Sequence, residues 1–134
     1  MILVKNGFLG KETVDALNGL IVQKVPIKTS QVLIKVVRKV NLVLNEINMK
    51  RQEIMMRHIE RDKEGNPVFA LDNDGNVIPN RVKIVNESAF QQEINEYLNQ
   101  EQEINVDKIS VSELGDIKIE PIHLMSLEWL VITD

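Results

Sequence analysis

Four basic side chains in one stretch of the chain have the chemistry to bind an anion. Arg38, Arg51, Arg57 and His58 all fall within residues 29–62. A guanidinium group binds a phosphate through two parallel hydrogen bonds, and a histidine ring can add another donor. These residues are therefore our candidates for a partner or ligand site. The small molecule they would suit is an anionic, nucleotide-like ligand.

Arg51 and His58 stand out because they lie seven residues apart, near the centre of an otherwise apolar helical stripe. A buried guanidinium must be paired, since an unpaired buried charge costs several kcal/mol. Two interpretations are open. In the structural one, the helix has left the core by residue 51, or a carboxylate such as Glu93 or Glu96 satisfies the charge. In the functional one, the pair anchors a partner or an anionic ligand.

Other residues with reactive side chains are better explained by structural roles in turns or in the core. The acidic cluster at residues 72–76 invites a calcium loop, but that alignment puts Arg81 where the loop needs its bidentate Glu. Tyr97 and His123 lie on or beside apolar helical faces, where such residues are usually part of the core. The sequence shows no nucleophile–base pair and no cluster of metal ligands. We therefore expect a non-enzymatic protein without a cofactor or metal.

The candidates must be positioned by one long amphipathic helix, which the sequence predicts from about Thr29 to Asp62. Ser30 is the expected N-cap, and the Gly and Pro of residues 65–67 stop the helix. Charges of both signs lie opposite the stripe, with Glu46–Lys50 and Glu53–Arg57 at the favourable i,i+4 spacing. Steps of 100° place these residues on the apolar stripe: Leu33, Val36, Val37, Val40, Leu44, Ile47, Ile54 and Met55.

The segment Val32–Leu44 carries two conflicting signals. It is rich in β-branched residues, and its even positions are apolar, as in a strand. However, it runs without a breaker into the strongly helical segment Asn45–Arg61. We interpret the whole stretch as helix; if the segment is a strand, the helix starts near Asn41.

The remaining elements predict an α+β fold within one domain, residues 1–134. Residues 2–5 suit a short strand or an apolar cap, and a first helix at Lys11–Gln23 completes an antiparallel helical hairpin over about 10–62. A mobile β-hairpin follows at about 64–85, and a Ser88 capping box opens a helix at about 88–102. Residues 103–134 give a small antiparallel sheet, from alternating segments at 103–111 and 116–120, and a terminal helix opened by Pro121.

Composition excludes several classes of function. The chain of 134 residues has a formal net charge of −4 and no cysteine. The acidic balance and the aromatic content of 4% disfavour nucleic-acid binding. The apolar run Met1–Val4 is too short for a signal peptide, and no run is long enough for a membrane span. We therefore expect a soluble protein that binds neither nucleic acid nor membrane.

Several turn and helix-cap motifs follow one another along most of the chain, at segments 24–30, 64–67, 74–76, 90–93, 103–106 and 119–122. The order of these motifs resembles a family of small proteins encoded by tailed phages of Gram-positive bacteria. The resemblance implies a viral origin and an accessory role, and it supplies no catalytic residues.

Two functions follow as expectations. The first is a phage accessory protein that binds other proteins through its long helix, as an assembly or tail factor or as an inhibitor of a host factor. Its partner would be a second copy, a phage protein or a host protein, and its location the host cytoplasm or the virion. The second is an anti-defence protein that sequesters a small anion through arginines of the long helix.

Overall fold

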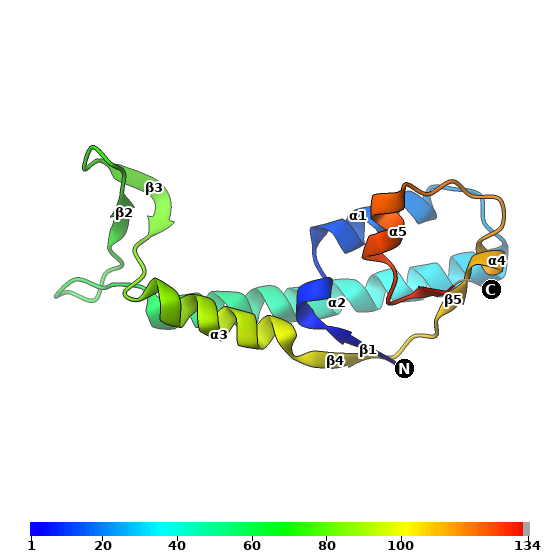
Figure 1. Cartoon of the computed structure of the whole chain (residues 1–134), viewed down its shortest axis with the longest axis horizontal. Helices are drawn as coiled ribbons and strands as arrows, with labels where there is room; N and C mark the ends of the chain where they lie inside the picture. The colour runs from blue at the N-terminus through cyan, green and yellow to red at the C-terminus, as the bar shows by residue number, and fades with distance from the viewer. Residues whose placement is uncertain (133–134) are drawn as a thin grey trace. The chain divides into compact units, whose positions relative to one another are not determined.

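The structure is a computed structural model that describes residues 1–132, and it confirms the α+β class (Figure 1). The chain divides into two compact units: one comprises Met1–Ile47 and the chain from Leu98 onward, and the other comprises Asn48–Tyr97. In chain order the elements are β1 (Ile2–Lys5), the 3₁₀ turn η1 (Asn6–Phe8), α1 (Lys11–Ile21), α2 (Ile27–His58), β2 (Phe69–Leu71), β3 (Val77–Val82), α3 (Glu87–Asn99), β4 (Glu101–Ile104), β5 (Ile109–Ser110), α4 (Val111–Leu114), α5 (Pro121–Ser126) and β6 (Val131–Ile132).

The predicted long helix is present as α2, which contains 32 residues and includes all of Val32–Leu44. The apolar stripe explains why helix prevails over strand in this segment. Its members Leu33, Val36 and Val40 are buried, whereas Ile34 and Leu42, which a strand would place on the same face as Val36 and Val40, are exposed. A period of 3.6 residues therefore accounts for the burial, and a period of two does not.

Both ends of α2 differ from the expectation. Ser30 is not the N-cap, because its amide already donates to the Pro26 carbonyl at 2.9 Å, and the helix begins at Ile27. The helix ends at His58 rather than near Asp62. The chain becomes extended after His58, and Ile59 forms an antiparallel bridge with Ile84.

The sheets are small, and β1–β4 and β5–β6 pair strands that are not neighbours in sequence. Among the described residues they are three two-stranded sheets: β1 with β4 and β2 with β3 are antiparallel, and β5 with β6 is parallel. The antiparallel pairing expected between 103–111 and 116–120 is wrong. Residues 103–111 contribute to two strands, β4, which pairs with β1, and β5, which pairs with β6. Residues 116–120 form no strand. The Gln23 side chain makes hydrogen bonds to the backbone N–H and carbonyl of Lys118, at 3.0 and 2.5 Å.

The terminal helix is shorter than expected. Pro121 opens α5 as predicted, but the helix ends at Ser126, and the chain returns to an extended form at β6. Leu127 and Leu130 are fully buried and anchor this end of the chain in the first unit, where α5 packs against α1. In contrast, Ile122 and Met125, which we expected to pack inward, are exposed.

In the second unit two turns are built alike. Asp62 and Asp72 each begin an Asp-x-x-Gly-Asn segment, and their Oδ1 atoms each accept two backbone N–H groups at 2.8–2.9 Å. Gly65 and Gly75 both have φ of +83°, a conformation that favours glycine. The acidic cluster at residues 72–76 is therefore the expected turn, and it leads from β2 into β3.

The helix α3 begins at Glu87, two residues earlier than a capping box with Ser88 as N-cap implies. Asn86 provides the cap: its Oδ1 accepts the Ala89 amide at 3.1 Å, and its carbonyl accepts the amide of Phe90. This is the geometry of an N-cap residue. The helix also ends at Asn99, before the expected residue 102, because the chain then enters β4.

Candidate functional site

The structure places the four predicted site residues in two different units. Arg51, Arg57 and His58 belong to the second unit, whereas Arg38 lies on the α2 segment of the first unit, where it is exposed. Within the second unit, Arg57 and His58 are brought together by one carboxylate, that of Glu93 on α3.

Glu93 uses both of its oxygens. Arg57 Nη2 lies 2.6 Å from Glu93 Oε1, and His58 Nε2 lies 2.5 Å from Glu93 Oε2. The edge of the Phe90 ring packs against the imidazole, with the ring centroids 5.7 Å apart. The hydrogen bond from His58 holds the pKa of Glu93 below its usual value of 4.5; burial opposes this shift, and the charge of Arg57 adds to it.

This arrangement differs from the pairing suggested by the sequence. Glu93 was a candidate partner for Arg51, but it binds Arg57 and His58 instead. Arg51 is exposed and forms no ion pair within residues 1–132, although α2 has not left the core at this point, since Ile54 is buried. The expected pairing of Glu53 with Arg57 is replaced by a Lys50–Glu53 contact at 3.3 Å.

Arg51 nevertheless lies beside a shallow hollow of about 490 Å³. The side chains around it come from α2 and α3, and two of them, Asn48 and Gln52, carry amides. The predicted basic residues thus separate into two that share the Glu93 carboxylate, Arg57 and His58, and two that form no ion pair in the described part of the chain, Arg38 and Arg51.

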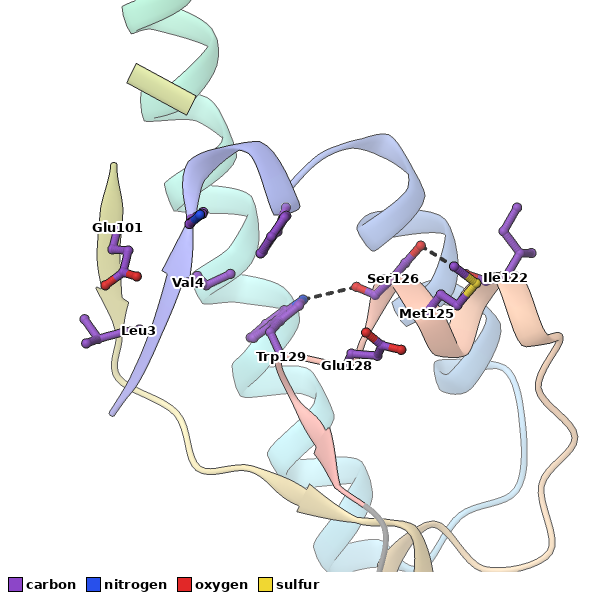
Figure 2. Close-up of a pocket in the computed structure, with 10 residues that line it drawn as sticks. Leu3, Val4, Glu101, Ile122, Met125, Ser126, Glu128 and Trp129 are labelled. Carbon is purple, nitrogen blue, oxygen red and sulfur yellow. Dashed lines mark hydrogen bonds between the residues drawn. The ribbon is translucent and has the colours of Figure 1, made fainter. Parts of the chain in front are cut away.

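A larger hollow lies in the first unit, where the sequence predicted no site. It has a volume of about 570 Å³ and lies between β1 and η1 on one side and α5 with the following turn on the other (Figure 2). We call it the β1–α5 groove. Its lining residues are Leu3, Val4, Lys5, Phe8, Glu101, Ile122, Met125, Ser126, Glu128 and Trp129.

The walls of the β1–α5 groove are largely apolar, and two of its polar groups are hydrogen-bonded to the backbone of the chain. Trp129 Nε1 donates to the Ser126 carbonyl at 3.2 Å, which fixes the indole ring beside the groove. The Ser126 hydroxyl donates to the Ile122 carbonyl of its own helix at 3.1 Å. That hydroxyl is therefore engaged within α5 and is not poised as a nucleophile.

The sequence does not predict the β1–α5 groove, because the groove depends on which apolar residues the tertiary fold leaves exposed. Periodicity assigned Ile122 and Met125 to the buried face of a terminal helix, together with Leu130. Only the fold shows that the chain buries Leu127 and Leu130 and leaves the first two exposed. The exposed apolar strand residue Leu3 completes the groove from the other end of the sequence.

Two further searches bear on function. Across residues 1–132, acidic and histidine side chains do not gather in groups of three that could hold a metal ion. Nor does any helix in this part of the chain combine the length and apolar character needed to cross a membrane.

Comparison with protein-family models, with curated proteins and with solved structures finds no match to this chain.

Proposed function

We propose that this protein is a non-enzymatic binding protein that engages another protein through the β1–α5 groove. One observation carries the proposal: four large apolar side chains around the groove are well exposed. Leu3, Phe8, Ile122 and Met125 have 61%, 63%, 61% and 68% of their surface accessible. Scattered exposed apolar residues are ordinary, but a group of them around one hollow is typical of a protein-binding surface.

The chemistry of the groove supports binding rather than catalysis. Its hydroxyl group is bonded within α5, and its lining combines apolar walls with a few charges. Burying an apolar side chain in such a hollow stabilises a complex by about 25 cal/mol per Å² of apolar surface removed from water. We further propose, from the motif order described above, that the partner is a phage or host protein and the role an accessory one.

The long helix offers a competing surface for the same function. Met49 and Met56 lie seven residues apart on the part of α2 that belongs to the second unit, and both are exposed. We favour the β1–α5 groove because it is concave and is lined from several elements, so a side chain placed in it would be desolvated on several sides.

Anion capture through Arg51 is the second candidate. The observation that favours it is an exposed guanidinium beside a hollow with two amide side chains, Asn48 and Gln52. Arg57 and His58 add little, because both already bind the Glu93 carboxylate. A nucleotide that raises the melting temperature of the wild-type protein, but not that of Arg51→Ala, would favour this alternative.

The experiment that tests the main proposal compares two methionines. Tagged wild type, Met125→Glu and Met49→Glu are recovered gently from expressing or infected cells, and their complexes are weighed by native mass spectrometry. Met49 is a matched control because it is 73% exposed on a helix outside the groove. We expect a defined partner with wild type and Met49→Glu that is lost with Met125→Glu. If the partner were lost with Met49→Glu alone, the binding surface would lie on the long helix instead of in the groove.

A further inference from the structure

Among the residues that the structure describes, β1 pairs with β4 alone, and the pairing identifies which side of β1 is free. Ile2 lies opposite Ile104, and the register continues to Lys5. Just beyond it, the Asn6 amide donates to the Gln100 carbonyl at 3.0 Å. Because hydrogen-bonded and non-hydrogen-bonded pairs alternate in antiparallel sheets, Ile2 and Val4 bond to β4. The backbone groups of Leu3 and the N–H of Lys5 therefore point away from β4.

The free side of β1 borders the β1–α5 groove. Leu3, Val4 and Lys5 all line the groove, together with Trp129 from the far wall. In Figure 2, Glu101 and β4 lie on one side of β1, and Trp129 lies on the other. An unpaired strand edge and an apolar groove thus lie side by side, and these are the two parts of a site that accepts an added strand.

The charges at the groove indicate what the added strand would carry. Glu101 and Glu128 line it, and neither takes part in an ion pair among the residues that the structure describes. Of the described residues that line the groove, Lys5 is the only cation, and its Nζ lies 5.9 Å from the centroid of the Phe8 ring. The groove is therefore acidic around apolar walls, which complements a segment with apolar residues flanked by basic ones.

We propose that the β1–α5 groove binds a short extended segment of another protein, which pairs with the free edge of β1 and carries apolar side chains flanked by Lys or Arg. This inference rests on the proposed protein-binding function and specifies its partner. β1 spans four residues, so the paired segment is of similar length. Backbone pairing at Leu3 provides a general attraction, while the apolar walls and the two carboxylates provide the selectivity.

The probe is a displayed library of random octapeptides, selected on the full chain and counter-selected on Met125→Glu. We expect enriched peptides with alternating apolar residues next to Lys or Arg. The same peptides should bind Met49→Glu as they bind wild type, and Glu101→Lys about tenfold more weakly. Binding should also change the emission of Trp129, which is the only tryptophan of the chain.

Two readouts are specific to strand pairing. Hydrogen exchange at the Leu3 amide should slow when the peptide binds, whereas the Val4 amide, already bonded to β4, should change little. Methylating the peptide amide that faces β1 should abolish binding while leaving every side chain intact. Peptides that bind equally well when methylated, or that are acidic or helical, would overturn the proposal.

Two further outcomes separate this inference from the function on which it rests. If cellular partners depend on Met125 but the library yields no basic, apolar peptide, the groove binds proteins and the strand-pairing inference is wrong. If the free protein is a dimer whose Leu3 amide is already protected, a second copy occupies the groove and the inference also fails.

Discussion

The imidazole of His58 lies 2.5 Å from the carboxylate of Glu93, so the last residue of α2 is joined to the middle of α3. The His58 side chain is only 19% exposed, and the Phe90 ring packs against it. The second oxygen of Glu93 holds Arg57. Two of the predicted ligand-binding residues, Arg57 and His58, therefore help to hold the second unit together.

The contact between His58 and Glu93 should make stability depend on pH. The pKa of Glu93 is lowered in the folded chain, chiefly by the hydrogen bond from His58. A lowered pKa stabilises the fold above the ordinary value of about 4.5, and this contribution is lost as the pH falls through the folded value. Glu93→Gln should therefore lower the urea midpoint at pH 7, and its difference from wild type should shrink as the pH falls below 4.5.

Glu96→Gln is the control for this measurement, because Glu96 is exposed and accepts a hydrogen bond from Gln92 of its own helix, and it forms no ion pair within residues 1–132. It should leave the pH profile of the urea midpoint close to that of wild type. A Glu93→Gln deficit that stays constant from pH 7 to pH 3 would contradict the assigned role of the carboxylate.

Replacing Arg51 should hardly affect stability. Its side chain is exposed and forms no ion pair in the described part of the chain. Arg51→Ala should change the free energy of unfolding by less than about 0.5 kcal/mol, as is usual at surface positions. Urea denaturation checks this directly. A loss of about 3 kcal/mol or more would mean that Arg51 is buried and paired.

The helical assignment of Val32–Leu44 can be tested with two leucines. Leu33 is 1% exposed, whereas Leu42 is 65% exposed on the same helix. Leu33→Ala should lower the free energy of unfolding by about 2–5 kcal/mol, because it removes buried methyl groups and leaves a cavity. Leu42→Ala should cost less than about 0.5 kcal/mol. Equal losses in denaturation experiments would be inconsistent with the burial pattern of α2.

The sequence predicted the local elements better than their partners. Hydrophobic periodicity correctly gave α2, and turn chemistry correctly gave the reversals at Gly65 and Gly75. Alternation also indicated strands near both ends of the chain. It carries no information about which strand pairs with which, so the pairing of β1 with β4 could not be derived, and the expected pairing with 116–120 was wrong.

The same limit applies to the candidate site. The helical wheel placed Arg51 and His58 on the apolar side of α2, and Glu93 was recognised as a carboxylate able to pair there. The wheel gives the direction of a side chain but not the axial register between two helices. That register decides that Glu93 meets Arg57 and His58 rather than Arg51. The β1–α5 groove depends entirely on such long-range placement.

The turn between β2 and β3 gives a final test with neighbouring aspartates. Asp72 Oδ1 accepts the amides of Asp74 and Asn76 at 2.9 and 2.8 Å. Asp72→Ala should therefore destabilise the β2–β3 hairpin by about 1 kcal/mol, the usual net value of such hydrogen bonds. Because a hairpin can open locally, the measurement is hydrogen exchange at the amides of β2 and β3 rather than global unfolding.

Asp74→Ala is the matched control, because the Asp74 carboxylate makes no hydrogen bond within residues 1–132 and only its backbone amide takes part in the turn. It should leave hydrogen exchange unchanged, and added calcium should not slow exchange in either variant or in wild type. If Asp74→Ala accelerated exchange as much as Asp72→Ala, the acidic charge of the loop would matter more than its hydrogen bonds. Slower exchange of the wild type in calcium would revive the cation-binding interpretation that the spacing around Arg81 excludes.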